Sequence, residues 1–453
     1  MRETPAGVVT ADGWRKAVET PSLPEVHSSI PVNSKGSFWH KLFVFAGPGC
    51  LVAVGYMDPG NWATDLAGGA QFGYTLLSVI LVSNIMAIIL QHLALKLGIV
   101  SGRDLAQACR DHYSKPVSVT LWILCEIAII ACDLAEVIGS AVALNLMFKI
   151  PLVVGVVLTA LDVLLVLYLQ NKGFRYIEAM VVGLIAIIGG CFAYEMIVSV
   201  PSVIGILGGL IPKSEVVTNP SMLYIAIGIL GATVMPHNLY LHSSIAQTRA
   251  YERNDAGKAM AIKYSTIDST FSLMLALFIN GAILILSAAA FHGSGHQDVA
   301  DINDAYHLLS PLLGASFASI LFGVALLASG LNATLTGTMA GQIVMEGFMN
   351  IRVRPWVRRL ITRSIAIVPA VIVAGFYGDA EGGVGKLLIL SQVVLSLQLG
   401  FAVVPLVMFT SEKRKMGRFV NAFWLKSVAW LITAVIIVLN VYLLFQTLSS
   451  WLS

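Results

Sequence analysis

Residues 55–65 read GYMDPGNWATD and lie inside a long apolar run, 42–69, that has the length of a membrane-crossing helix. Pro59 has no backbone N–H to donate, and Gly60 adds backbone freedom. Asp58 and Asn61 place side-chain oxygens at the same level. One interpretation is a proline kink whose polar groups are satisfied by neighbouring helices. The carboxylate favours a functional site instead, because ionisable groups inside membranes are rare and broken membrane helices line cavities.

The composition is that of an integral membrane protein. Of the 453 residues, 57% are hydrophobic and 12% are charged, whereas about 25% of the residues of a soluble domain are charged. A membrane-crossing helix needs about 20 mostly apolar residues, and eleven segments meet that requirement. They cover approximately residues 42–69, 73–97, 117–148, 152–170, 178–200, 222–248, 266–291, 311–349, 357–377, 384–410 and 427–448. The five cysteines form no C-x-x-C pair, which predicts neither disulfides nor a zinc site.

The basic residues predict an N-terminus inside the cell. In that orientation most of the 28 lysines and arginines fall on the cytoplasmic side, and Lys149, Lys213 and Lys386 are the exceptions. Cytoplasmic loops are enriched in Lys and Arg, so this alternation supports eleven helices with the C-terminus outside. We expect three parts: a polar, flexible cytoplasmic tail without a signal peptide at 1–36, a transport core at 37–410, and an inner loop with the eleventh helix at 411–453.

A second interruption occurs in the sixth apolar segment, where residues 231–243 read GATVMPHNLYLHS. Pro236 frees backbone carbonyls near Ala232 and Thr233. The first and sixth segments hold the same position in two blocks of five helices. Discontinuous helices at corresponding positions of two halves indicate an inverted-repeat transporter with its binding site near the middle of the membrane.

The residues at the two breaks have the chemistry of a divalent transition-metal site. Asp58 and Asn61 offer oxygens, as do the carbonyls released around Gly55 and Tyr56, and Met235 offers a thioether. A thioether adds little to a Mg²⁺ or Ca²⁺ site, whereas Mn²⁺, Fe²⁺ and later transition metals use it. Ordinary packing in an apolar core is the alternative role for Met235.

The chain resembles the Nramp family of proton-coupled divalent metal transporters, most closely its bacterial manganese-uptake members. The resemblance rests on DPGN at 58–61 and MPH at 235–237, and it extends over nearly the whole chain. Further matching motifs are GGAQFGY at 68–74, SGRDLA at 101–106, CDLAEVIGSA at 132–141, GATVMPHNLYLHSS at 231–244, LLASGLNATLTGTMAGQIVMEGF at 326–348 and ILSQVVLS at 389–396. It implies an all-α integral membrane protein with the leucine-transporter-like fold of the APC superfamily. In that fold, helices 1–5 and 6–10 form inverted repeats, helices 1 and 6 are broken, and an eleventh helix follows.

The resemblance also implies the metal ligands. They are Asp58, Asn61 and Met235, the carbonyls of Gly55 and Ala232, and, in some conformations, Gln392. Family members often have alanine where this chain has Gly55, which still serves because the ligand is a backbone oxygen. Relatives that carry Mg²⁺ lack the methionine and alter DPGN, so the presence of both in this chain argues against Mg²⁺.

A proton route is predicted beside the metal site. At about 100° per residue, Asp133 lies about 20° and Glu136 about 80° from Glu126, so these three acids share one face of the third membrane helix. Three carboxylates are too costly to face lipid, and they are therefore either structural pairs or a proton relay. His237, beside the metal site, is a histidine, the residue type that can titrate near neutral pH. The resemblance places on the route Asp58, His237, Glu136, Asp133, Arg358 and Arg359. A static buried salt bridge with the arginines is the alternative for Asp133.

The predicted function is secondary active transport. The chain is expected to import Mn²⁺, Fe²⁺ and other divalent transition metals together with protons, by alternating access across the cell membrane. The alternatives are an amino-acid or organic-cation transporter of the same fold and a metal-gated channel. No nucleophile–base pair or histidine-rich metal motif indicates an enzyme. The expected partners are metal ions, protons and the lipid bilayer, with no cofactor, nucleic acid or obligate protein partner.

Overall fold

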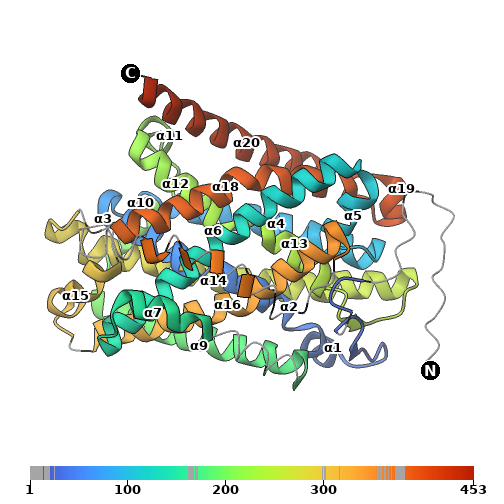
Figure 1. Cartoon of the computed structure of the whole chain (residues 1–453), viewed down its shortest axis with the longest axis horizontal. Coiled ribbons are helices and arrows are strands. Elements are labelled where there is room, and N and C mark those ends of the chain that lie inside the picture. Colours follow the sequence, from blue (N-terminus) through green and yellow to red (C-terminus); the bar gives the residue numbers. More distant parts are fainter. Residues whose placement is uncertain are drawn as a thin grey trace.

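The computed structural model describes residues 14, 21–24, 26–161, 168, 172–297, 299, 302–315, 317–351, 354, 357, 360–361, 364–365, 367–368, 370–372 and 383–452. Long helices run between two ends of the molecule, with α5 and α19 at one end and α3, α10 and α15 at the other (Figure 1). The elements are β1 (Ile30–Pro31), α1 (Phe38–Phe45), α2 (Pro48–Gly55), α3 (Pro59–Phe72), α4 (Leu77–Ser101), α5 (Leu105–His112), α6 (Lys115–Phe148), α7 (Leu152–Leu158), η1 (Thr159–Leu161), α9 (Phe174–Ser199), α10 (Val203–Gly209), α11 (Glu215–Thr218), α12 (Pro220–Thr233), α13 (Pro236–Ile245), β2 (Arg249–Ala250), α14 (Asp255–Ala290), η2 (His292–Ser294), α15 (Ile302–Leu313), α16 (Ala318–Met349), α18 (Gly383–Thr410), α19 (Lys413–Met416), η3 (Gly417–Phe419) and α20 (Phe423–Leu452).

Within the described residues, 8 spans are long and apolar enough to cross a membrane, and α12 with α13 counts as one of them. The bent pair α1 and α2 makes a ninth. These spans correspond to the predicted segments along the chain. The predicted ninth segment and the second half of the fourth fall mainly on residues outside the described ranges.

Both predicted helix breaks are confirmed. Helix α2 ends at Gly55, and α3 begins at Pro59, with Asp58 as the residue that caps it. Helix α12 ends at Thr233, and α13 begins at Pro236. Proline is favoured at the first position of a helix, because a backbone N–H at that position has no partner within the helix and proline therefore loses no hydrogen bond. Its fixed φ also suits the helix. The prolines therefore begin the second half of each broken helix.

The largest differences from the predicted helix boundaries occur at three places. The first span has an additional bend of 44° between α1 and α2, where Gly47 has a φ of 127°. Helix α14 begins at Asp255, about three turns before the predicted 266, because the Asn254 side chain accepts a hydrogen bond from the Gly257 N–H and caps it. The predicted eighth segment is divided into α15 and α16 around Gly314, whose φ is 64°. A left-handed glycine ends a helix at low cost.

The two broken helices lie at the centre of the molecule. In the most apolar part of α12 and α13, 94% of the residues are buried, compared with 33% for α9 and for α20. Helix α3 packs against α14, α12 and α18, while α6 packs along α16. Figure 1 shows α20 along one edge of the bundle. The helices that carry the predicted site are therefore shielded, and the outer helices present their apolar side chains outward.

Part of the segment predicted as a flexible tail contacts the helical core. Strand β1 pairs with β2 in parallel, with Ile30 opposite Arg249. The Ser28 N–H donates to the Gln247 carbonyl at 3.0 Å, and the Leu23 N–H donates to Glu346 Oε2 at 3.2 Å. This segment therefore connects the end of α13 with α16.

Candidate metal-binding site

The Asn61 side chain joins the two helix breaks. Its Nδ2 donates to the Tyr56 carbonyl at 2.8 Å and to the Ala232 carbonyl at 3.2 Å. Tyr56 lies at the break in the first span, and Ala232 lies in the last turn before the break in the sixth. One amide therefore fixes the separation of two helix ends that are far apart in the sequence.

Asp58 sits at the same break and is fully buried. Its Oδ1 accepts a hydrogen bond from the Asn61 N–H at 2.8 Å, which caps α3. The capping N–H groups lie at the N-terminal end of α3, which is the positive end of the helix dipole. Its Oδ2 points away from this cap toward Cys132, 3.8 Å from Sγ.

Met235 comes from the other break and is also fully buried. A Cβ added to Gly55 would lie 3.1 Å from Met235 Sδ and 2.2 Å from Asn238 Nδ2. The thioether therefore packs directly over the end of α2, and a Cβ at position 55 would have to displace the Asn238 amide.

Gln392 reaches the site from α18. A Cβ on Gly60 would lie 1.7 Å from Gln392 Nε2, so the glutamine side chain lies against the backbone of the first turn of α3. Gln392 is fully buried, and its Nε2 donates to Ser391 Oγ at 3.1 Å. The structure thus brings together all six of the predicted ligand residues: Asp58, Asn61, Met235, Gly55, Ala232 and Gln392.

Two oxygens at this site have no hydrogen-bond partner among the described residues. They are Asn61 Oδ1 and Gln392 Oε1, and both residues are at most 1% exposed. Buried polar atoms usually have a partner, so these acceptors are suited to a cation. No group of three His, Cys, Asp or Glu side chains in the described part of the chain is arranged to hold a metal ion.

Two expected ligand carbonyls already accept hydrogen bonds, and the first is that of Ala232, which accepts from Asn61 Nδ2. The Tyr56 carbonyl, freed by the break, accepts hydrogen bonds from Asn61 and from Asn280 Nδ2, the latter at 2.6 Å. The next carbonyl, that of Met57, accepts from Trp62 Nε1 and Ser329 Oγ. Asn280 and Ser329 were not identified from the sequence, although each is a polar residue inside an apolar helix.

The predicted proton-route residues divide into two groups. Asp133, Glu136 and His237 are all at most 3% exposed, and Cys132 Sγ lies 3.8 Å from Glu136 Oε1. Glu126 is half-buried and accepts a hydrogen bond from Trp122 Nε1 at 2.9 Å. The predicted partners Arg358 and Arg359 lie outside the described residues.

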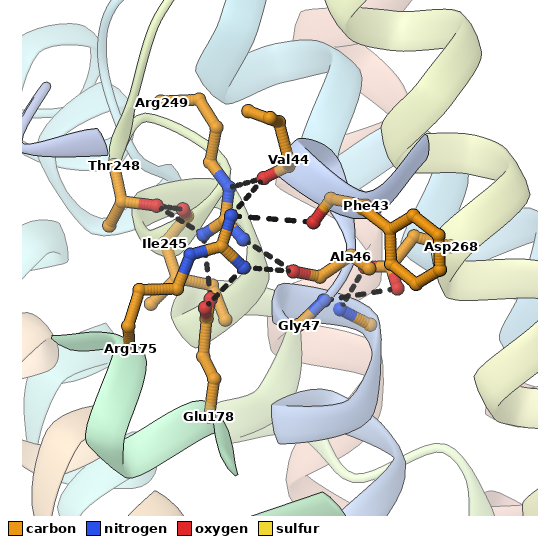
Figure 2. Close-up of polar contacts among 11 residues, drawn as sticks. Phe43, Val44, Ala46, Gly47, Arg175, Glu178, Ile245, Thr248, Arg249 and Asp268 are labelled. Carbon is orange, nitrogen blue, oxygen red and sulfur yellow. Dashed lines mark hydrogen bonds and ion pairs between the residues drawn. The ribbon is translucent and has the colours of Figure 1, made fainter. Parts of the chain in front are cut away.

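A second polar cluster surrounds the bend between α1 and α2 (Figure 2). Arg249 donates to Glu178 Oε1 at 2.7 Å and to the carbonyls of Val44 and Ala46. Arg175 donates to the same two carbonyls, to that of Phe43 and to Glu178 Oε2. On the far side of the bend, Asp268 accepts the N–H groups of Gly47 and Gly49. Side chains from β2, α9 and α14 therefore satisfy the backbone groups that the bend exposes.

Solved structures of two transporters identify the fold. Mhp1, a nucleobase-cation-symport-1 family transporter, has a TM-score of 0.54 at 14% identity and covers 92% of this chain and 93% of its own. MhsT in complex with L-phenylalanine has the same TM-score and identity and covers 87% of this chain and 98% of its own. Together with the two broken helices, these likenesses define a leucine-transporter-like membrane fold.

Closer relatives identify the family. The sequence profile described as natural resistance-associated macrophage protein-like, Nramp, matches residues 49–446. The divalent metal cation transporter MntH of Listeria monocytogenes serotype 4a is 64% identical over 441 residues, which are 97% of this chain and 98% of that protein. The Eremococcus coleocola manganese transporter, solved with an aromatic bis-isothiourea substituted compound, has a TM-score of 0.86 at 43% identity and covers 93% of this chain and 90% of its own. The chain belongs to the Nramp family and is a multi-pass membrane protein.

Proposed function

We propose that this chain imports Mn²⁺, with Fe²⁺ and other divalent transition metals as further substrates, and that it couples import to the inward movement of protons. The observation that carries the proposal is the Asn61 bridge between Tyr56 and Ala232, which joins both helix breaks beside Asp58. The names of the relatives as divalent metal cation and manganese transporters support the choice of substrate.

The proposed binding step uses groups from both breaks. The metal ion sheds part of its water and is bound by Asp58, Asn61 and Met235, with the carbonyls of Gly55 and Ala232. Gln392, whose Oε1 has no partner in the described structure, completes the set. A mixture of hard oxygens and one soft sulfur suits a divalent transition metal better than Mg²⁺ or Ca²⁺. The broken helices then move so that the site opens to the other side of the membrane.

Proton coupling is proposed to begin at Asp58, because a carboxylate that binds a metal ion cannot also hold a proton. Glu136, Asp133 and His237 are buried close to this level and offer a route separate from that of the metal. Cys132 Sγ, between Asp58 and Glu136, links the two carboxyl groups. An inward-negative membrane potential adds about 2.3 kcal/mol per charge per 100 mV to the driving force.

The same fold in MhsT binds L-phenylalanine, so an amino-acid transporter is the principal rival. An amino acid would need an open pocket and free helix ends for its carboxylate and amine. Here the end of α3 is already capped by Asp58, and Met235 and Gln392 fill the space over Gly55 and Gly60. A metal-gated channel is the second rival. Its flux would not saturate as the Mn²⁺ concentration rises, whereas that of a transporter would.

The test is uptake into proteoliposomes that contain a Mn²⁺-sensitive dye or a pH-sensitive dye. We expect saturable Mn²⁺ uptake, acidification of the lumen, and weak competition by Mg²⁺ and Ca²⁺. Replacement of Asp58 by alanine should abolish both signals. Normal Mn²⁺ uptake by that variant would refute the assigned site, and uptake without acidification would refute the coupling.

A further inference from the structure

An apolar groove lies on the side of the bundle formed by α4, α11, α12 and α20. Its volume is about 350 Å³, within the range of ligand-binding pockets, about 300–1,000 Å³. Ala226, Ile227 and Leu230 of α12 are buried beneath it, whereas Val82 and Val435 on its rim are 44% and 39% exposed. Because the chain is a multi-pass membrane protein, this exposed apolar rim faces lipid.

The groove has the depth of one lipid leaflet. It extends along α4 from Ser78 to Met86, eight positions that rise about 12 Å along the helix. On α12 it extends from Leu223 to Leu230. The hydrocarbon core of a bilayer is about 30 Å thick, so each leaflet contributes about 15 Å. The length of the groove therefore fits an acyl chain of one leaflet and is too short for a helix that crosses the membrane.

A positive charge stands at one end of the groove. Lys213, between α10 and α11, is exposed and forms part of the lining. Its Nζ donates to Oγ1 of Thr75, just before α4, at 3.5 Å, so the lysine lies at the Ser78 end. An ammonium group has three donors, and this is its one hydrogen bond among the described residues, which leaves donors for a phosphate. Lys213 is also one of the three basic residues that the predicted orientation does not place on the cytoplasmic side.

We propose that this groove binds one acyl chain of an anionic glycerophospholipid, whose phosphate contacts Lys213, from the leaflet predicted to face outside the cell. Basic groups beside membrane helices bind anionic lipid headgroups. Small side chains are typical where membrane helices pair, whereas the exposed rim here carries the branched residues Val82, Val217 and Val435, which favours a lipid over a second copy of the chain. The site does not depend on the metal-transport function proposed above.

The first test is native mass spectrometry of the detergent-solubilised protein titrated with phosphatidylglycerol, which counts the lipids that each chain retains. We expect one tightly bound lipid on the unaltered protein and about fivefold weaker binding to Lys213→Gln, the effect of one lysine on an anionic lipid. The matched control is Lys149→Gln, because Lys149 is exposed and is predicted to lie on the same side of the membrane. Equal affinities in the two variants, or no retained lipid on the unaltered protein, would overturn the proposal.

The second test fills the groove and leaves the lysine in place. Val82→Trp puts a large side chain on the rim, and Val182→Trp is its control, because Val182 is 47% exposed on α9 and does not line the groove. We expect Val82→Trp to weaken lipid binding at least tenfold and Val182→Trp to leave it unchanged. Displacement of the lipid by glycerol phosphate, which has no acyl chain, would show that the site binds phosphate alone and would overturn the proposal. A mass of two chains that disappears in Val82→Trp would identify a second copy as the occupant and would also overturn it.

Discussion

Met235 Sδ packs over Gly55 in the fully buried centre of the molecule, where it adds a soft ligand to a set of oxygens. Replacement by leucine keeps the volume and removes the sulfur, so the expected loss is chemical rather than one of packing. For Met235→Leu we predict a KM for Mn²⁺ raised by roughly tenfold, about 1.4 kcal/mol, and stronger relative competition by Ca²⁺. The matched control is Met222→Leu, in the first turn of α12. Unchanged competition by Ca²⁺ would remove Met235 from the ligand set.

Gly60 is a second test at the residue scale. A Cβ there would lie 1.7 Å from Gln392 Nε2, so alanine must displace the glutamine from the first turn of α3. We predict that Gly60→Ala lowers Mn²⁺ uptake at least tenfold while the protein remains folded. Gly190→Ala is the control, because Gly190 is exposed within α9 and an added Cβ meets nothing within 4 Å. Full uptake by Gly60→Ala would show that the glutamine contact is unimportant.

The residue types at the breaks were sufficient to predict Asp58, Asn61 and Met235 as a group, because a carboxylate, an amide and a thioether at interrupted membrane helices have few structural uses. The hydrogen bonding of the Tyr56 carbonyl was not predictable from the sequence. It depends on Asn280, which lies 224 positions along the chain and meets the break only through packing of α14. The position of Cys132 against Asp58 has the same origin, since the pair are 74 positions apart.

At the scale of elements, the bend between α1 and α2 depends on a buried ion pair. The side chains of Arg249 and Glu178 are 1% and 4% exposed, and Arg175 also pairs with Glu178. For Glu178→Gln we predict a loss of stability of about 3 kcal/mol, because removal of one partner leaves buried positive charge uncompensated. The thermal unfolding temperature in detergent measures the loss.

The control for this prediction is the pair Arg418 and Asp255, whose side chains are 66% and 58% exposed. Exposed ion pairs contribute about 0–1 kcal/mol, so Asp255→Asn should leave the unfolding temperature almost unchanged. Equal shifts in the two variants would show that the cluster in Figure 2 does not stabilise the bend.

Local signals explain which element boundaries were predictable. Both central breaks contain a proline within an apolar run, and the sequence alone places them correctly. The start of α14 at Asp255 was missed because its first three turns carry several polar residues and extend beyond the apolar segment. The bend at Gly47 was missed because a Gly-Pro pair is also compatible with an unbent helix. The cluster of Arg175, Glu178 and Arg249 that surrounds the bend comes from distant parts of the chain.

At the scale of the whole molecule, the arrangement of the ends fits the charge pattern in the sequence. Helices α5 and α19, which carry the basic segments predicted to be cytoplasmic, lie at one end of the long axis, and α10 lies at the other (Figure 1). The sequence predicts the side of the membrane through its lysines and arginines. In the structure, the long apolar helices run between these two ends (Figure 1).

Orientation is testable with one residue at each end. Lys413 in α19 and Lys213 between α10 and α11 are both exposed, and positive charge is retained preferentially on the cytoplasmic side. We predict that an impermeant maleimide labels Lys213→Cys in intact cells, whereas it labels Lys413→Cys only after the membrane is opened. The unaltered protein, whose five cysteines are half-buried or buried, provides the background signal. Labelling of Lys413→Cys in intact cells would contradict the predicted orientation.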